Sequence, residues 1–173
     1  EIKKTIFALK HIQDVALIGK GEVFHAQEIR IEAYDVAHFG GTALVGAMSV
    51  SENGTLEKNA YRKFKIKSFE GVNDMRALAE ILERRIAHTE WTLPRLIVVD
   101  GGAAQVNTAK RVLALAGIAI PVVGVVKDEH HRPKKIVGDR MFATRYEKDI
   151  LLANNEAHRF AIGYHRKHLA RRL

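Results

Sequence analysis

Residues 96–102 are Leu96-Ile97-Val98-Val99-Asp100-Gly101-Gly102, a pattern typical of a strand in the middle of a sheet. Four consecutive apolar side chains, three of them β-branched, predict a strand that is buried on both faces. The two glycines permit a sharp turn, and residues 103–116 then follow a helical pattern. Asp100 is therefore expected at the carboxyl end of a central strand, where open α/β sheets place their sites. A carboxylate there is costly unless it is paired, solvated or bound to a cation; the simpler alternative is that it caps the next helix.

The residues before this strand predict antiparallel strands. In residues 29–36, Ile31, Ala33 and Asp35 share one face, so a carboxylate lies in phase with apolar side chains. Glu52-Asn53-Gly54 is a hairpin signal. In chain order we expect a leading helix within residues 1–20, strands at 29–36, 42–50 and 60–67, a helix at 73–88, the central strand, a helix at 103–116, a strand at 122–126 and a long helix from about residue 145.

This order of elements predicts an α/β fold. The sheet is expected to be mixed and five-stranded, with three antiparallel strands followed by two parallel strands, and to be flanked by helices. The first strand is expected at the centre with the fourth strand parallel beside it, which makes Asp35 and Asp100 neighbours. Residues 21–173 are expected to form this domain and residues 1–20 to lead into it. Residues 127–137 are polar and basic and predict an exposed loop, and a short strand or hairpin is expected within residues 136–144.

Composition limits the classes of function. The chain has 173 residues and a net charge of +8, which favours polyanionic partners. It has no cysteine, which excludes disulfides and thiolate metal sites. The longest apolar run, residues 112–126, contains Gly117 and Pro121 and is too short to span a membrane. Because the sequence begins at Glu1, we expect it to be part of a longer protein.

Two neighbouring carboxylates indicate a particular chemistry. Asp35 and Asp100 repel each other unless a cation neutralises them. A hard divalent ion with oxygen ligands fits this need best. In a basic protein that favours a phosphate backbone, such an ion indicates phosphodiester hydrolysis.

Three motifs resemble those of a known family. They are Arg30-Ile31-Glu32-Ala33-Tyr34-Asp35-Val36-Ala37-His38, then Asp100-Gly101-Gly102 with Gln105, then Glu156-Ala157-His158-Arg159-Phe160-Ala161-Ile162. Together they resemble the C-terminal endonuclease half of UvrC, the incision subunit of bacterial nucleotide-excision repair. Residues 11–18 also resemble the segment that enters that domain. The resemblance extends over nearly the whole chain.

The resemblance implies a ribonuclease-H-like fold with an Asp-Asp-His metal site. By position, the ligands would be Asp35, Asp100 and His158, with Mg²⁺ or Mn²⁺ as the cofactor and Asp74 as a further catalytic residue. It also implies incision of damaged double-stranded DNA on the 5′ side of a lesion. The implied protein is cytoplasmic, associated with the bacterial nucleoid and not with a membrane, and monomeric. It would contact a UvrB-type helicase subunit through parts of UvrC that this chain lacks.

Other residues are candidates for binding DNA. Lys127 ends the fifth predicted strand, close to the proposed site, where it could stabilise charge on the scissile phosphate. The basic end of the last helix could contact phosphates, and a solvated helix face is the alternative. The predicted DNA-binding residues are Lys127, Arg159, His165, Arg166 and Lys167.

The sequence also departs from the family pattern. Ala103 stands where the family has lysine, and Asn154-Asn155 stands where it has Arg-Asp. Residues 128–135 are also unlike the family's typical stretch. These differences leave the proposed ligands intact and concern the positioning of DNA. Two alternative functions therefore remain: a catalytically weakened module that binds DNA or protein, and a ribonuclease-H-like nuclease with another nucleic-acid substrate. If neither residue has a functional role, His158 is a surface histidine and Asp74 is only an acid in the first turn of a helix.

Overall fold

The computed structural model describes residues 29–39, 43–67 and 73–170, apart from the side chains of Phe39, Ala43 and residues 164–170. The predicted leading helix of residues 1–20 lies outside these ranges. The described elements are β1 (Arg30–Phe39), β2 (Ala43–Glu52), β3 (Thr55–Leu56), the 3₁₀ helix η2 (Lys58–Ala60), β4 (Arg62–Lys65), α2 (Asp74–Ala87), β5 (Leu96–Asp100), α3 (Ala103–Leu115), β6 (Val122–Lys127), β7 (Pro133–Gly138), α4 (Arg140–Arg145) and α5 (Glu147–Ala170).

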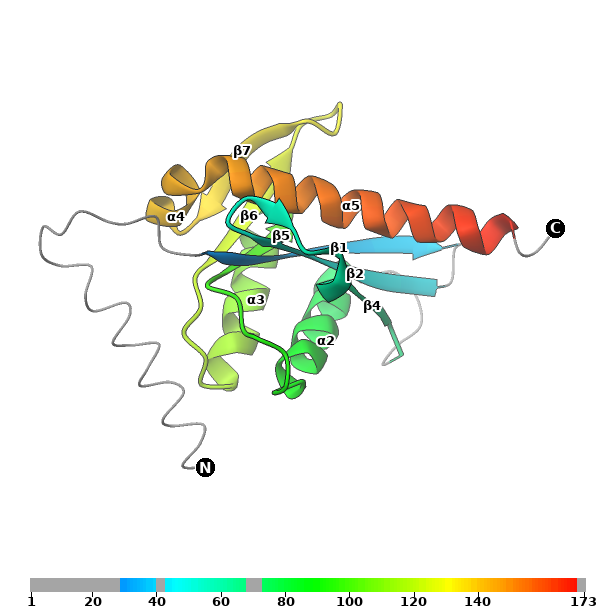
Figure 1. Cartoon of the computed structure of the whole chain (residues 1–173), viewed down its shortest axis with the longest axis horizontal. Coiled ribbons are helices and arrows are strands. Elements are labelled where there is room, and N and C mark those ends of the chain that lie inside the picture. Colours follow the sequence, from blue (N-terminus) through cyan, green and yellow to red (C-terminus); the bar gives the residue numbers. More distant parts are fainter. Residues whose placement is uncertain (1–28, 40–42, 68–72, 171–173) are drawn as a thin grey trace, which may run out of the picture.

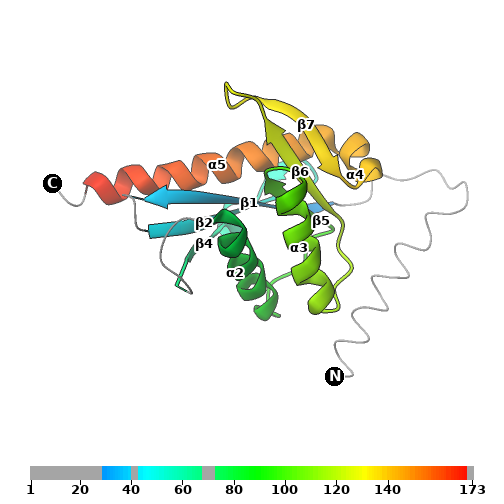
Figure 2. The same ribbon diagram turned by 180° about the vertical axis from the view of Figure 1, so that it is seen from behind.

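One mixed sheet forms the middle layer of the molecule. Its strand order is β3-β2-β1-β5-β6-β7, and β4 also pairs with β2. Helices α2 and α3 lie on one face, and α5 runs across the other (Figures 1 and 2). As predicted, β1 is central, antiparallel to β2 and parallel to β5.

The number of strands was predicted wrongly, since the described residues form a sheet of seven strands rather than five. The third predicted strand, 60–67, corresponds to β4, whereas the short β3 before it was not predicted. The 3₁₀ helix η2 separates β3 from β4, and the two pair with separate parts of β2. The seventh strand, β7, lies partly within the predicted exposed loop and pairs antiparallel with β6. It is an edge strand, and its residues Lys134 and Lys135 are exposed to water. Its sequence therefore lacks the run of apolar residues by which a buried strand is recognised.

Each face of the sheet buries its own apolar core. On the α2 and α3 side, Val99, Leu82 and Val106 belong to one buried cluster. On the α5 side, Ile31 and Val98 belong to another. The buried apolar residues of α5 in the described part of the chain are mostly small: Ile150, Ala153, Ala157 and Ala161 are at most 1% exposed. Because their side chains are short, α5 lies close to the sheet.

A buried ion pair ties β1 to α2. Arg85 donates to Glu32 through Nε at 2.9 Å and through Nη2 at 2.8 Å. The Tyr34 hydroxyl donates to the same carboxylate at 2.7 Å, and Arg85 also reaches the Thr92 carbonyl at 2.7 Å. Burial, together with the charge of Glu32, raises the pKa of Tyr34 well above its usual value, so the phenol stays protonated and can donate. This network satisfies a carboxylate that is 0% exposed.

Helix boundaries follow local capping chemistry. Asn73 caps α2, because its side chain accepts a hydrogen bond from the Arg76 backbone at 2.9 Å. Helix α3 ends before Gly117, whose φ of +67° suits glycine. The long final helix begins at Glu147, since the short helix α4 occupies the residues just before it. No helix in the described ranges is both long and apolar enough to cross a membrane.

Candidate metal centre

Three elements bring Asp35, Asp100 and His158 together. Tyr34 of β1 pairs with Val99 of β5, so the next residue on each strand, Asp35 and Asp100, stands at the end of the same ladder. Both side chains project toward α5, in phase with the apolar residues of that face. His158 is on α5 and presents its Nδ1 to Asp35 Oδ2 at 3.3 Å. One ligand atom from each of the three residues lies within 4.8 Å of the others.

The environment of Asp35 opposes its negative charge. The residue is 6% exposed. Burial raises its pKa above the usual range, and the neighbouring carboxylate of Asp100 adds to the rise. His158 and Lys127 act in the opposite direction and do not cancel it. A cation beside Asp35 and Asp100 would relieve both the desolvation and the repulsion.

Asp100 is held by two further side chains. Lys127 Nζ, at the end of β6, lies 2.8 Å from Asp100 Oδ1. Asn154 Nδ2, on α5, donates to the same oxygen at 3.3 Å. Asn154 is completely buried, and its Oδ1 has no hydrogen-bond partner among the described residues. Sequence reasoning placed Lys127 near the site but gave no role to Asn154, which was noted only as a departure from the family pattern.

Asp74 is not part of this group. Its Oδ1 lies 2.9 Å from His38 Nε2, so it joins the start of α2 to the end of β1. His38 is three residues beyond Asp35 and therefore projects from the other face of the strand. The structure thus gives Asp74 a contact that its predicted catalytic role does not require, and that role remains a prediction.

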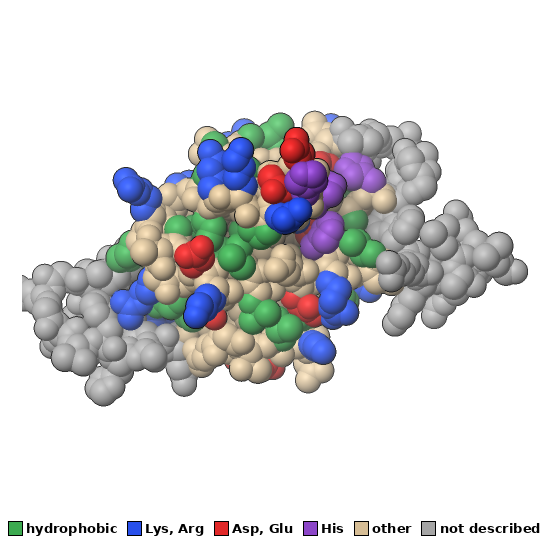
Figure 3. Space-filling view, turned by 90° about the horizontal axis from the view of Figure 1, so that it is seen from above, with side chains coloured by type: hydrophobic (Ala, Val, Ile, Leu, Met, Phe, Trp, Pro, Cys, Tyr) green, Lys and Arg blue, Asp and Glu red, His purple; other side chains and the backbone are tan. Residues whose placement is uncertain are grey.

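The predicted DNA-binding residues lie in different surroundings. Arg159 is paired along α5 with Glu156, donating through Nε at 2.7 Å. The hydrogen bonds from Arg159 lower the pKa of Glu156. Arg159 also lines a surface pocket on α5 with His158, so the imidazole is open to solvent. His165, Arg166 and Lys167 are on the last part of α5, where the side chains are outside the described set. The face seen in Figure 3 shows histidine side chains gathered beside acidic and basic ones.

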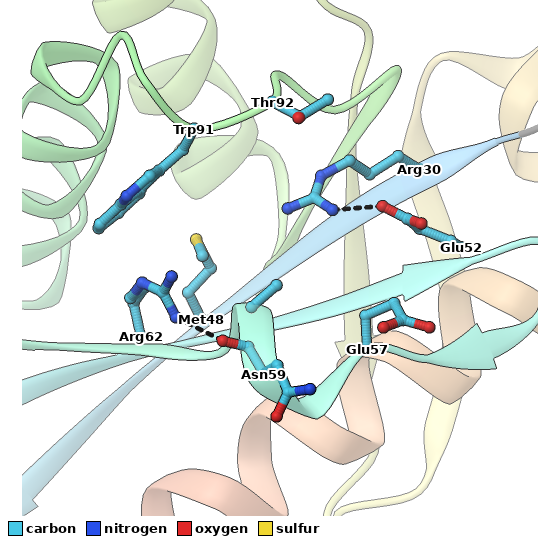
Figure 4. A pocket seen from close by; sticks show the side chains of 9 residues that line it. Arg30, Met48, Glu52, Glu57, Asn59, Arg62, Trp91 and Thr92 are labelled. Carbon is cyan, nitrogen blue, oxygen red and sulfur yellow. Dashed lines mark hydrogen bonds and ion pairs between the residues drawn. The ribbon is translucent and has the colours of Figure 1, made fainter.

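A second pocket, of about 320 Å³, contains none of these residues (Figure 4). Its two arginines are already engaged. Arg30 is paired with Glu52, and Arg62 donates to the Asn59 carbonyl at 2.8 Å. The Arg62 guanidinium also lies over the Trp91 ring, 4.7 Å from its centroid. These contacts account for the pocket as local packing.

The donor set fits a divalent cation. Two carboxylates and one imidazole are ligands that Mn²⁺ accepts, and the carboxylates also suit Mg²⁺. The position of Lys127 supports this interpretation, because an ammonium group already sits 2.8 Å from one of the proposed ligand oxygens. The residues present are therefore compatible with the cofactor expected from the sequence.

Comparison with known proteins identifies the family. A family model described as the UvrC RNAse H endonuclease domain matches residues 22–162. The chain belongs to this family. The UvrABC system protein C of Caldicellulosiruptor saccharolyticus is 43% identical over 169 residues, which cover 94% of this chain. That of Chlorobium chlorochromatii is 45% identical over 144 residues, or 80% of this chain.

Membership of the UvrC endonuclease-domain family confirms the predicted ribonuclease-H-like fold. The chain spans less than a third of these relatives, 28% of the first and 23% of the second. Among solved structures, human ENDOV aligns with 83% of this chain and 66% of its own, at 12% identity and a TM-score of 0.47.

Proposed function

We propose that this UvrC-type domain is a divalent-metal-dependent endonuclease that hydrolyses phosphodiester bonds in DNA. The observation that carries the proposal is the convergence of Asp35, Asp100 and His158 from two strands and a helix, with ligand atoms within 4.8 Å. The name of the family supports an endonuclease, and the net charge of +8 supports a phosphate-rich substrate.

The three proposed ligands would contribute differently to binding the metal. Asp35 and Asp100 supply negative charge, and His158 adds a nitrogen ligand from α5. A bound Mg²⁺ or Mn²⁺ would activate water and stabilise charge on the phosphate. Asn154 fixes the orientation of Asp100 by its hydrogen bond. Lys127 lies close enough to pair with a phosphate oxygen once the charge of Asp100 is shared with a cation.

The finer features of the activity follow from the relatives named UvrABC system protein C. We assign to the domain the incision of damaged double-stranded DNA on the 5′ side of a lesion, in bacterial nucleotide-excision repair in the cytoplasm, at the nucleoid. In this assignment the domain is monomeric and meets a UvrB-type subunit through parts of the protein beyond this chain.

The test compares Asp35→Asn with a matched surface change, Glu83→Gln. Wild type and Glu83→Gln should bind Mn²⁺ by calorimetry and nick supercoiled plasmid DNA when Mn²⁺ is added. Asp35→Asn should lose both properties while keeping its circular-dichroism spectrum, because the amide preserves shape and removes charge. Metal binding and nicking by Asp35→Asn at the wild-type level would refute the assignment.

The choice of substrate separates the alternatives. Damaged duplex DNA and an RNA–DNA hybrid are offered to the wild-type chain with Mn²⁺. Cutting of the duplex supports the proposal. Preferential cutting of the hybrid would instead identify a ribonuclease-H-like nuclease with another substrate. Binding of both without cutting either would identify a weakened binding module.

A further inference from the structure

The hairpin formed by β6 and β7 projects from the same end of the sheet as the candidate metal centre. Strand β6 is parallel to β5 and ends at Lys127, the residue that contacts Asp100. The chain then turns through residues 128–132 and returns as β7. Figures 1 and 2 show this turn rising past α5, on the side of the sheet away from α2 and α3. The turn therefore lies on the face that carries His158.

The turn has a defined shape. Asp128 Oδ1 accepts hydrogen bonds from the backbone of His130 at 2.8 Å and of Arg132 at 2.9 Å. The Asp128 backbone N–H donates to the Arg132 carbonyl at 2.8 Å, and His131 takes a φ of +59°. Asp128 thus directs its carboxylate inward at the backbone, and the side chains of the turn point outward.

The returning half of the hairpin carries cations without acidic partners. Arg132, Lys134 and Lys135 are exposed, and none of them has an ion pair among the described residues. Arg159 on α5, by contrast, is paired with Glu156. Exposed cations that remain unpaired keep their full charge for a partner.

A β-bulge interrupts the pairing at the start of β7. Lys135 pairs with Val126 and Pro133 pairs with Lys127, so Lys134 is the extra residue that has no partner on β6. Arg132 and Lys134 flank the partner of Lys127, at the strand end that contacts Asp100. Both cations are therefore placed to meet a ligand that reaches the metal centre.

We propose that the β6–β7 hairpin is a phosphate-binding finger for the substrate strand, in which Arg132 and Lys134 contact the DNA backbone beside the scissile bond. The inference rests on the proposed endonuclease function. A strand whose phosphate reaches Asp35 and Asp100 passes the end of β6, and the finger neutralises the adjoining phosphates. Such contacts position the strand and do not depend on base sequence.

The competing explanation is that the lysines only protect an edge strand from pairing with other chains. That role requires charge on β7 and does not require DNA. The two explanations therefore differ in what happens to DNA affinity when the charges are removed.

The test uses two double variants that each remove two positive charges. Arg132→Ala/Lys134→Ala alters the finger, and Lys110→Ala/Arg111→Ala alters exposed residues of α3 on the far side of the sheet. Both are made in the Asp35→Asn background, so that affinity for a fluorescent duplex is measured by anisotropy without cleavage. The finger variant should bind several-fold more weakly, and the slope of log K against log salt should fall by about 2, one unit for each lost phosphate contact. The control should match its parent.

Each outcome bears on one proposal only. Equal affinities and equal salt slopes for the two double variants would overturn the finger, and so would equal losses in both. A finger effect in a protein whose wild type never cuts DNA would leave the finger standing and refute the endonuclease. As a second comparison, Lys134→Glu should weaken binding more than Lys110→Glu, because Lys134 lies beside the strand end that reaches the metal centre and Lys110 lies on α3. An equal or larger loss for Lys110→Glu would contradict the proposed finger.

Discussion

Two carboxylates on β1, three residues apart, have opposite surroundings. Glu32 faces α2 and is neutralised by Arg85 with two hydrogen bonds. Asp35 faces α5 and meets a second carboxylate, so burial and repulsion raise its pKa. The charge of Glu32 is therefore neutralised by an internal partner, whereas the charge of Asp35 remains unfavourable. An unfavourable buried charge of this kind is typical of a functional site, such as one that binds a cation.

Removing the partner of Glu32 should be costly. Arg85→Met leaves a completely buried carboxylate without its cation and should lower the free energy of unfolding by about 3–5 kcal/mol. Adding Glu32→Gln should recover more than half of that loss, because the amide is neutral and still accepts from Tyr34. Urea unfolding of the single and double variants measures both values. A double variant no more stable than Arg85→Met would show that the buried charge is not the cause.

Asn154 should influence metal affinity without being a ligand. Its amide is one of two groups that orient Asp100, and loss of an orienting partner typically weakens metal binding about 10- to 100-fold. Asn154→Ala should therefore bind Mn²⁺ at least about 10-fold more weakly by calorimetry. The neighbouring Asn155→Ala is the control, because that side chain is exposed. Unchanged affinity in Asn154→Ala would remove it from the site.

The sequence pattern alone predicted the positions of Asp35 and Asp100, but neither His158 nor the pair Glu32–Arg85. Alternation along residues 29–36 correctly placed Asp35 in phase with apolar residues, and the end of the central strand gave Asp100. His158 came only from the resemblance, since nothing local distinguishes it from a surface histidine. The pair Glu32–Arg85 was missed, because alternation put Glu32 on the opposite face without showing that this face is buried too. Its partner is 53 residues away in sequence.

Helix α5 is the element that completes the centre, and its small residues determine its distance from the sheet. Ala153, Ala157 and Ala161 recur every four residues and so form one stripe. Ser49 of β2 donates to the Ala153 carbonyl at 2.7 Å, a contact that only a closely packed helix allows. The next residue after Ala157 is His158, so the stripe also sets the position of the imidazole.

A larger side chain in this alanine stripe should move His158 away from the two aspartates. Ala157→Leu introduces volume where the side chain is 0% exposed and should destabilise the fold by about 1–3 kcal/mol. It should also weaken Mn²⁺ binding, because displacement of α5 moves His158 away from Asp35. Ala114→Leu on α3 is the control, since that residue is exposed. Thermal unfolding and calorimetry report the two effects, and normal Mn²⁺ affinity in a destabilised Ala157→Leu would show that the stripe does not position the site.

Elements with a strong hydrophobic pattern were the predictable ones. The runs at 96–100 and 122–126 and the helices at 73–88 and 103–116 agree with β5, β6, α2 and α3 to within about two residues. β7 was not recognised over its full length, because an edge strand keeps one side in water and here carries lysines. The last helix, expected from about residue 145, begins at Glu147, after α4 ends at Arg145.

For the whole molecule, metal binding and folding should be linked. The three ligands belong to elements that only the folded chain brings together, so a metal that binds the native state stabilises it. At a free Mn²⁺ concentration 100 times Kd, the gain is about 2.7 kcal/mol, which should raise Tm by roughly 5–10 °C. Asp35→Asn should show no such rise, and without metal it should be at least as stable as wild type, because a neutral group replaces an unfavourable buried charge. Scanning calorimetry with and without Mn²⁺ provides the comparison; an equal shift in both proteins would place the metal elsewhere.

The spacing of the ligands along the chain also has a consequence for biosynthesis. His158 follows Asp35 by 123 positions and is on the last helix described. A ribosome that has released the polypeptide only through β6 has made both aspartates, but neither the imidazole nor the helix that closes over them. Translation therefore delivers the last proposed ligand together with the segment that covers one face of the sheet. An unfinished nascent chain that ends before α5 therefore lacks the complete proposed centre.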